Sequence, residues 1–386
     1  MNTTSFTQFG ARLRDLVHGD FEESATELFR VQFETNPAYR LICKARGLTP
    51  QTVKHWSEIP AVPTTAFKKL ELSCLRPEQR THVFHSSGTT GQKPSRHFHN
   101  AESLALYEES LLIGFRQNVV ATRPVVMLLL MPPKAEAPHS SLVHMFETVR
   151  RELGAADSEF LGRVTSDGEW TVALETSVSK LGQACHANEP VCILGTAFSF
   201  VHFLDHLRDQ GKRIQLPPGS IAMETGGYKG KSRELPRVEL HNLISSHLGI
   251  RPRDIVCEYG MSELSSQAYG KVSSVRCQGT DRKNPHALNP TLITRSASPV
   301  PLTPDTRHSP LFHFPPWARA QIISPETGRE VNEGETGLIR VFDLANVYSV
   351  MAIQTEDLAI KRGSGFELLG RAALAEPRGC SLMSLA

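Results

Sequence analysis

The sequence predicts an α/β protein whose main sheet is largely parallel. Short apolar runs alternate with amphipathic segments: 125–130 then 141–153, 191–194 then 197–208, and 220–223 then 235–248. Short apolar runs are typical of buried strands, and apolar residues spaced by three and four are typical of helices. Alternation of this kind indicates parallel strands joined by helical crossovers, whose carboxyl ends commonly bind ligands. A further strand is expected at residues 254–257.

The regions on either side of these segments differ in composition and in apolar spacing. Apolar residues at helical spacing predict a helical N-terminal region that leads into the sheet, and residues 101–119 predict another helix. Residues 278–316 are rich in proline, serine and charge and predict a long irregular segment. Runs at 320–323, 337–342 and 350–353 predict strands of a small β-rich region. We therefore expect a helical N-terminal region (1–80), an α/β core (81–275), a β-rich closing subdomain (276–371) and a short tail (372–386).

Composition excludes several classes of protein. The chain has 386 residues, 40% hydrophobic and 21% charged, which is ordinary for a globular protein with more than one core. A net charge of +2 gives no support to binding of nucleic acid or of an anionic membrane. No apolar run approaches the roughly 20 residues needed to span a bilayer, and the N-terminus lacks the apolar region of a signal peptide. Seven scattered cysteines without a Cys-x-x-Cys pair indicate reduced thiols and a cytoplasmic protein.

One stretch concentrates glycines, hydroxyls and a lysine: Ser86, Ser87, Gly88, Thr89, Thr90, Gly91 and Lys93. Glycines let a backbone fold tightly around a ligand, and arrays of N–H donors suit phosphate oxygens. The spacing is not that of a Walker loop, because the two glycines are too close and Pro94 follows the lysine. The alternative is a flexible polar linker.

Two further segments follow predicted strands of the core. The pair Gly226–Gly227 allows close approach of the backbone to a flat ligand, although double glycines mostly mark turns. The second segment, Tyr259-Gly260-Met261-Ser262-Glu263, offers an aromatic face, a hydroxyl and a carboxylate. Tyrosine can stack on a base, and a carboxylate is a ligand that Mg²⁺ prefers. The alternative is a strand-end turn with a packed tyrosine.

Two segments near the end of the chain offer polar groups of other kinds. Asp357, expected on a loop after the strand at 350–353, can accept hydrogen bonds from both hydroxyls of a ribose. Arg371, in a Gly-Arg pair, can reach a ribose or a phosphate. Alone, each is equally compatible with an ordinary surface residue.

In this order the segments resemble the adenylate-forming (acyl- and aryl-CoA ligase-like) superfamily. Residues 86–91 match its phosphate loop, residues 259–263 its tyrosine-glycine-x-threonine-glutamate motif with serine for threonine, and residues 355–357 its threonine-glycine-aspartate with a central glutamate. Within it, the chain is most similar to the acyl-protein synthetase (LuxE-like) family. The segments that carry this likeness are residues 224–229, 342–346, 354–358 and 378–381.

The resemblance implies a layered αβαβα fold with a small β-rich subdomain, and attack of a carboxylate on MgATP to give acyl-AMP and pyrophosphate. Catalysis would then depend on positioning and on electrostatic stabilisation of the transferring phosphate. The implied roles are Ser86–Gly91 and Lys93 at the phosphates, Glu263 at Mg²⁺, Gly226, Gly227 and Tyr259 around the adenine, and Asp357 and Arg371 at the ribose. Gly260 and Ser262 complete the Tyr259 motif at the ATP site.

Most members of the superfamily carry a C-terminal lid domain with a catalytic lysine, and the resemblance implies that this chain lacks it. No lysine follows Lys361, and the LuxE-like family shares this short tail. Lys93, Lys229 and Arg378 are candidates to replace the missing lysine. In the LuxE-like family a cysteine near the C-terminus accepts the acyl group as a thioester, and Cys380 holds the matching position. The alternative is an inert surface cysteine.

Two lesser signals remain. Some relatives in the phenylacetate-CoA ligase branch carry zinc near this region, but the spacing of Cys257, Cys277 and His286 fits no compact zinc pattern. The aromatic segment with Phe198 and Phe200, and the segment with Ser141, are candidate walls of an acyl pocket. Ordinary core packing explains them equally well.

We therefore expect an ATP- and Mg²⁺-dependent acyl-protein synthetase that passes an acyl group from a fatty or related carboxylic acid to a protein thiol. The final acceptor would be a protein such as an acyl reductase or a carrier protein. One alternative is a truncated acyl- or aryl-CoA or carrier-protein ligase. The other is a non-catalytic nucleotide-binding scaffold, against which the joint presence of Lys93, Glu263 and Asp357 argues.

Overall fold

One large sheet organises the molecule in the computed structural model, which describes residues 20–86, 94–120, 124–226, 235–272 and 309–372. The sheet has twelve strands, in the order β13-β14-β15-β16-β12-β11-β10-β9-β8-β4-β5, with β1 paired to β15. Its strands are β1 (Val62–Pro63), β4 (Val126–Leu129), β5 (Glu159–Phe160), β8 (Val191–Thr196), β9 (Ile221–Thr225), β10 (Ile255–Tyr259), β11 (Ala268–Lys271), β12 (Leu311–His313), β13 (Ala318–Ile323), β14 (Thr336–Asp343), β15 (Ala352–Arg362) and β16 (Gly365–Arg371).

The sheet changes character along its width. Strands β5, β4, β8, β9 and β10 pair in parallel, as the strand–helix alternation predicts. From β10 onward, through β11, β12, β16, β15, β14 and β13, successive strands pair antiparallel, and the short strand β1 pairs in parallel with β15. The α/β core and the β-rich region therefore share one continuous hydrogen-bonded sheet. Two hairpins lie apart from it, β2 (His82–His85) with β3 (Arg96–His99) and β6 (Gly162–Val164) with β7 (Trp170–Val172).

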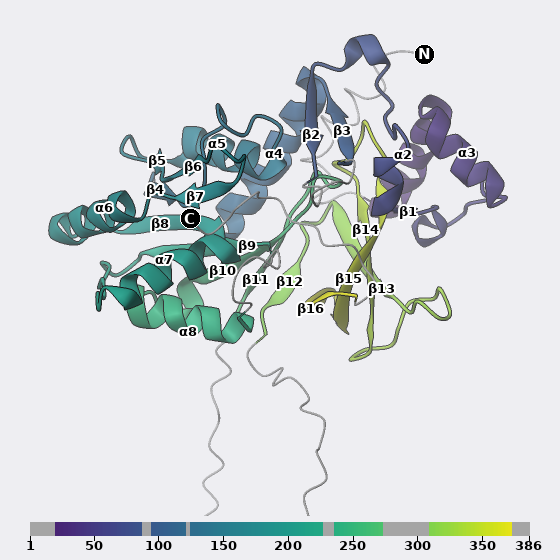
Figure 1. Ribbon diagram of the computed structural model, residues 1–386. Helices are drawn as coiled ribbons and strands as arrows, with labels where there is room; N and C mark the ends of the chain where they lie inside the picture. Colours follow the sequence, from purple (N-terminus) through teal and green to yellow (C-terminus); the bar gives the residue numbers. More distant parts are fainter. Residues whose placement is uncertain (1–19, 87–93, 121–123, 227–234, 273–308, 373–386) are drawn as a thin grey trace, which may run out of the picture.

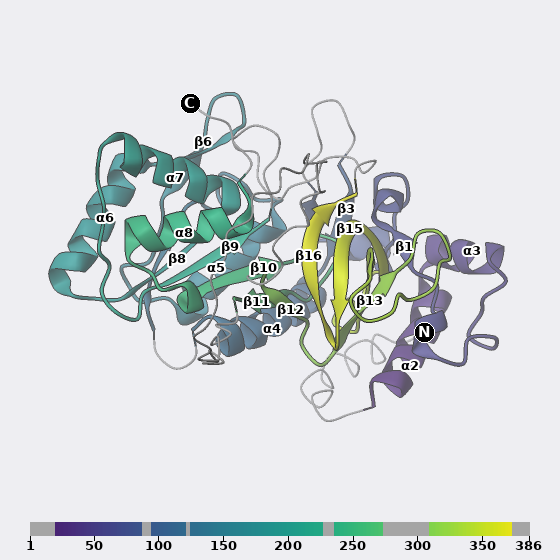
Figure 2. The ribbon, with the colours of Figure 1, turned by 90° about the horizontal axis from the view of Figure 1, so that it is seen from below.

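Helices cover both faces of the parallel half. In Figures 1 and 2, α7 and α8 lie together on one face of this half, and α4 and α5 lie on the other. Helices α2 and α3 flank the β-rich half (Figure 1). The helices are α2 (Phe21–Thr35), α3 (Pro37–Ala45), α4 (Ala101–Asn118), α5 (Ser141–Leu153), α6 (Leu174–Ala187), α7 (Ala197–Asp209) and α8 (Arg237–Leu248). No helix among them combines the length and the apolar character needed to cross a bilayer.

Local sequence explains where these helices begin and end. The Ser140 side chain accepts a hydrogen bond from the N–H of Val143, so α5 begins at the residue expected from its apolar spacing. Asn100 caps α4 in the same way, through the N–H of Ser103. Helix α8 ends at Gly249, whose φ of 69° is readily adopted only by a residue without a Cβ atom.

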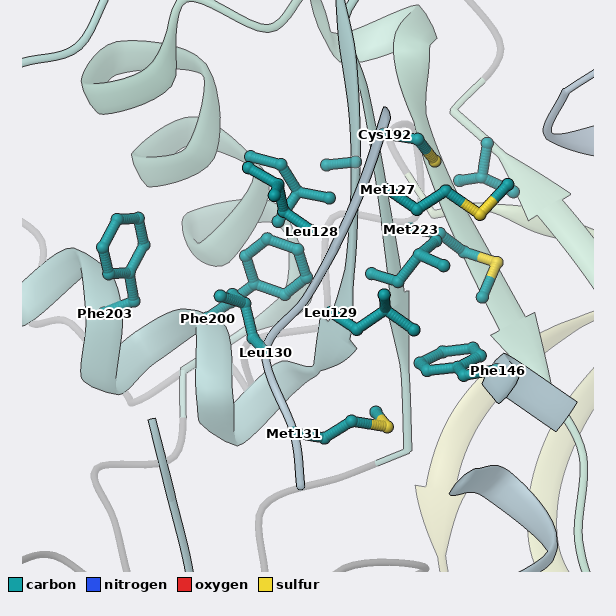
Figure 3. Packing of buried hydrophobic residues seen from close by; sticks show 14 of the residues in the cluster. Met127, Leu128, Leu129, Leu130, Met131, Phe146, Cys192, Phe200, Phe203 and Met223 are labelled. Atoms are coloured by element: carbon teal, nitrogen blue, oxygen red, sulfur yellow. The ribbon is translucent and has the colours of Figure 1, made fainter. Parts of the chain in front are cut away.

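The first core fills the space around the parallel strands. Every residue of β4 is buried, and successive side chains point to opposite faces. Figure 3 shows Met127 and Leu129 on the side of Phe146 from α5, and Leu128 and Leu130 on the side of Phe200 from α7. A strand that is buried on both faces explains the continuous apolar run at this position.

The second core lies under the β-rich half. It contains fully buried aromatic side chains from several elements, among them Phe29, Trp317 and Phe342. Gln32 of α2 crosses into it, donating to the carbonyls of Asn346 and Val347 over 2.8 and 3.0 Å and accepting from the N–H of Met351 over 3.0 Å. The N-terminal helices are therefore attached to the loop between β14 and β15.

Several expectations about elements are wrong. Residues 311–313 lie within the segment expected to be irregular, but they form β12 between β11 and β16. The strand expected at 350–353 begins at Ala352 and runs to Arg362, because it pairs along its length with β14 and β16. Asp357, expected on a loop, therefore lies inside β15. Helix α6 and the hairpin β2–β3 were not expected from the sequence.

Candidate active site

The β2–β3 hairpin carries the two ends of the glycine-rich loop. The N–H of Ser86 donates to the carbonyl of Ser95 over 3.3 Å, and the N–H of Ser95 donates to Ser86 Oγ over 3.1 Å. These bonds hold together Ser86 and Ser95, the two residues that we call the mouth of the loop. Several predicted site residues lie outside the described residues: Ser87, Gly88, Thr89, Thr90, Gly91, Lys93, Gly227, Lys229, Cys277, His286, Arg378 and Cys380.

Glu263 reaches this hairpin from the segment that follows β10. Its carboxylate is 3% exposed and lies 3.5 Å from Ser95 Oγ and 3.8 Å from His97 Nε2. The same hydroxyl and imidazole nitrogen are 2.8 Å apart. The ring of His97 also packs against Phe67, with centroids 4.8 Å apart. The fold thus brings the predicted Mg²⁺ ligand beside the mouth of the predicted phosphate loop.

Tyr259, Asp357 and Arg371 form a second group. The Tyr259 hydroxyl donates to Asp357 Oδ2 over 2.9 Å, and Arg371 Nε lies 3.5 Å from Asp357 Oδ1. Asp357 and Arg371 are opposite one another in the β15–β16 pair, which explains their proximity. Burial, together with the Asp357 carboxylate, raises the pKa of Tyr259 well above its ordinary value of 10.0. Three residues predicted from separate motifs therefore meet.

The ends of β9 and β10 carry another pair of polar side chains. Thr225 and Glu258 face each other in register, and the Thr225 hydroxyl donates to the Glu258 carboxylate. Burial raises the pKa of Glu258 from 4.5 to about 7. Gly226 follows with a φ of 69°, and a Cβ on Gly260 would lie 2.3 Å from Glu258 Oε1. The backbone conformation therefore favours glycine at 226, whereas at 260 it is the close approach of the Glu258 side chain that leaves little room for a Cβ atom.

A buried polar cluster lies behind the strand ends. Cys257 and Glu224 are register partners, and together with His241 of α8 they place three metal-ligating atoms within 4.8 Å of one another. Arg237 Nε lies 3.0 Å from Glu224 Oε1. Although burial acts to raise it, the charges of Arg237 and His241 keep the pKa of Glu224 below its ordinary value. The Arg237 guanidinium therefore already balances the negative charge of the Glu224 carboxylate.

The residues expected to line an acyl pocket lie in packed surroundings. Phe198 and Phe200 are 2% and 0% exposed and belong to the first core. Ser141 is buried, and its hydroxyl lies 2.9 Å from that of Ser262. The structure therefore places both phenylalanines where the core-packing alternative expected them, and Ser141 beside the Tyr259 motif.

Sequence reasoning missed several residues that contact this site. Ser95 and His97 contact Glu263, but they follow the glycine-rich motif and carry no local signal of a site. Asp343 and Asn346 belong to a segment that points to a family and implies no role for either residue. A cavity of about 490 Å³ also lies against the outer side of the β2–β3 hairpin. Its lining includes Arg80, Phe84, Phe98, Lys134 and His139.

Solved structures of a CoA ligase have a similar fold. A 2-hydroxyisobutyryl-CoA ligase in complex with 2-HIB-AMP and CoA in the thioesterification state matches with a TM-score of 0.61 and 13% identity, over 94% of this chain and 68% of that one. An open conformation of the ligase matches with a TM-score of 0.59 and 12% identity, over 90% of this chain and 73% of that one. These likenesses confirm the expected adenylate-forming fold.

Comparison with known sequences identifies the family as well as the fold. A long-chain-fatty-acid–luciferin-component ligase from Vibrio harveyi is 20% identical over 366 residues, covering 92% of this chain and 84% of the relative. The enzyme of the same name from Aliivibrio fischeri is 22% identical over 377 residues, covering 92% and 85%. The family model described as acyl-protein synthetase, LuxE, matches residues 21–284. This chain therefore belongs to the acyl-protein synthetase (LuxE) family.

Proposed function

We propose that this protein uses ATP to activate a fatty or related carboxylic acid and transfers the acyl group to a protein thiol. In the first step an oxygen of the carboxylate attacks the α-phosphorus of ATP. The bond from that phosphorus to the bridging oxygen breaks, so the products are acyl-AMP and pyrophosphate. In the second step a cysteine thiolate attacks the acyl carbon, and AMP leaves.

The observation that carries this proposal is the convergence of separately predicted motifs. Glu263 lies beside the mouth of the glycine-rich loop, and Tyr259 is bonded to Asp357, which pairs with Arg371. Convergence of hydroxyls, a carboxylate and a guanidinium at strand ends is what a nucleotide with a ribose and phosphates needs. In this proposal the Tyr259 ring and Gly226 hold the adenine, and Asp357 and Arg371 hold the ribose.

The donor set around Glu263 also fits Mg²⁺. A buried carboxylate with a neighbouring serine hydroxyl offers the oxygen ligands that this hard cation prefers. Glu263 would hold the ion, which would neutralise negative charge on the ATP phosphates when bound. The protein's own part is positioning, because a carboxylate needs no general base to attack phosphorus.

Exchange of radioactive pyrophosphate into ATP tests the first step. We expect exchange that depends on a carboxylic acid, and we expect a series of acids from acetate to palmitate to identify the preferred chain length. Glu263→Gln should reduce the exchange rate by about 100-fold or more, since electrostatic stabilisation at the phosphate is lost. A complete lack of exchange with every acid would instead favour a non-catalytic nucleotide-binding scaffold.

Self-acylation tests the acceptor. The relatives from Vibrio harveyi and Aliivibrio fischeri are named as ligases of a long-chain fatty acid and a luciferin component. By analogy we place Cys380 as the first acceptor and a partner protein, such as an acyl reductase or a carrier protein, as the next. Cys380→Ser should abolish labelling that is released by hydroxylamine and leave pyrophosphate exchange intact. Cys185→Ser, which changes a partly exposed cysteine on α6, is the matched control.

Two results would redirect this assignment. Undiminished labelling of Cys380→Ser would exclude Cys380 as the acceptor. Thioester formation only when CoA or a carrier protein is supplied would favour the CoA- or carrier-ligase alternative.

A further inference from the structure

The loop between β14 and β15 contacts the segment that carries Glu263. Asp343 ends β14 and is followed by Leu344, Ala345 and Asn346, and all four side chains are buried. The sequence gives these residues no chemical role. In the structure they lie against residues 263–266, which connect β10 to β11.

Asp343 holds the end of that connection. Its Oδ2 accepts hydrogen bonds from the N–H groups of Ser265 and Ser266, both over 2.8 Å. Its Oδ1 accepts from the Ser266 hydroxyl over 2.7 Å and from the N–H of Ala345 over 3.0 Å. Three of these four bonds go to Ser265 and Ser266, so they fix the chain two to three residues after Glu263.

Asn346 holds Glu263 itself. Its Nδ2 donates to the carbonyl of Glu263 and to that of Val350, each over 2.8 Å. Its Oδ1 lies 3.4 Å from the hydroxyl of Ser265. Since the carbonyl of Glu263 is fixed on one side and its carboxylate meets Ser95 on the other, the direction of the side chain is set from both ends.

The Asp343–Asn346 loop is itself anchored. Gln32 of α2 donates to the carbonyl of Asn346 and accepts from the N–H of Met351, so it holds both ends of the loop. Asp343 also donates its own N–H to the carbonyl of Met351 over 2.8 Å. A site group is positioned well only when the residues around it are themselves fixed by packing and hydrogen bonds.

We propose that Asn346 and Asp343 are positioning residues that aim the Glu263 carboxylate at the mouth of the phosphate loop. The inference rests on the proposed function, in which Glu263 acts on MgATP. Neither residue touches the reactants in this proposal. Their effect on the reaction is transmitted through Glu263 alone.

A double-mutant cycle tests that claim. Asn346→Ala should lower the rate of pyrophosphate exchange by about 10- to 100-fold, because a displacement near 1 Å costs about that much. In a Glu263→Gln background the same substitution should have no further effect. Asn118→Ala is the matched control, since Asn118 makes the same amide-to-carbonyl bond, over 2.9 Å to Gly114, on α4. An equal loss in both backgrounds would overturn the proposal.

Hydrogen exchange separates this proposal from the proposed function. Amides in residues 262–266 should exchange about tenfold faster in Asn346→Ala, and not in Asn118→Ala. Unchanged protection would overturn the positioning role even if exchange activity fell. Wild-type protein without any pyrophosphate exchange would overturn the proposed function, and the amide result would still decide whether Asn346 holds this segment. If Asn346→Ala does not fold, Asn346→Ser replaces it in both measurements.

Discussion

At the scale of single residues, the carboxylates of the candidate site differ in the groups that surround them. The Tyr259 hydroxyl donates to Asp357, and Arg371 lies 3.5 Å from Asp357 and donates to Glu356 over 2.8 Å, so neighbouring groups already hold the predicted ribose ligands. Glu258 differs, because its principal bond is to the Thr225 hydroxyl and its burial disfavours charge. The carboxylates of Asp357 and Glu258 should therefore respond differently to substitution and to pH.

Tyr259→Phe should weaken both folding and nucleotide binding. Loss of the hydroxyl removes a bond to a buried carboxylate, which should lower the free energy of unfolding by about 1–3 kcal/mol. Isothermal titration with an ATP analogue should show weaker binding. Tyr348→Phe is the control, because that tyrosine donates to Glu102 over 2.7 Å at another place. Equal loss of nucleotide affinity in both variants would contradict the assigned role of Tyr259.

Glu258 should make stability fall as pH rises. Its folded pKa of about 7 exceeds its ordinary value of 4.5, so the folded state binds the proton more tightly than the unfolded state. The stabilisation is fully present below the unfolded pKa and is lost as pH rises through the folded pKa.

Urea unfolding of Glu258→Gln at about pH 5 and about pH 8 measures this effect. The wild-type protein should lose about 1–3 kcal/mol more over this range than the variant does. Parallel curves for the two proteins would mean that Glu258 ionises normally. The glutamine retains an acceptor for Thr225, so the comparison isolates the charge.

At the scale of elements, polar side chains join segments that are distant in the sequence. Gln32 attaches α2 to the β14–β15 loop, and Asn346 and Asp343 attach that loop to the Glu263 segment. The N-terminal helices therefore support the candidate active site without contributing a predicted ligand to it. We therefore expect a substitution at Gln32, which is not a predicted nucleotide ligand, to affect the stability of the protein.

Gln32→Ala should lower the free energy of unfolding by about 2–4 kcal/mol, because three buried backbone groups lose their partner. Thermal and urea unfolding measure the loss. Thr26→Ala on the same helix should cost less than about 1 kcal/mol, since its hydroxyl bonds only to carbonyls within α2. A small effect at Gln32 would show that α2 contributes little to holding the loop.

At the scale of the whole molecule, one sheet connects the two cores. The predicted nucleotide ligands on strands come from β10, where the pairing changes from parallel to antiparallel, and from β15 and β16 in the antiparallel half. Ligand bound across this change should stabilise both halves together. The boundaries expected at residues 80, 275 and 371 stay a prediction.

MgATP should therefore raise the stability of the entire chain. At 100 times its dissociation constant it should add about 2.7 kcal/mol to the free energy of unfolding. Differential scanning fluorimetry should show one transition that moves to higher temperature as the concentration rises. The shift should be smaller for Tyr259→Phe at the same concentration. Movement of only part of the transition would indicate that the two halves unfold separately.

Local patterns in the sequence determined much of this protein. Apolar spacing and caps such as Ser140 set the helices, because helix formation depends on neighbours three and four residues away. The short apolar runs identified the parallel strands, since strands buried on both faces have few polar residues. The motifs around Ser86, Tyr259 and Asp357 pointed to the superfamily, and the segments 342–346 and 378–381 pointed to the family, because each of them is contiguous in the chain.

Only the tertiary structure decided how these motifs are arranged. Pairing with β14 and β16 placed Asp357 inside a strand, and no local signal specifies such long-range partners. The roles of Ser95, His97 and Asn346 likewise depend on contacts across 83 to 168 positions of sequence. Hydrogen bonds between distant segments leave no periodic pattern, so the support around Glu263 could be recognised only in the folded chain.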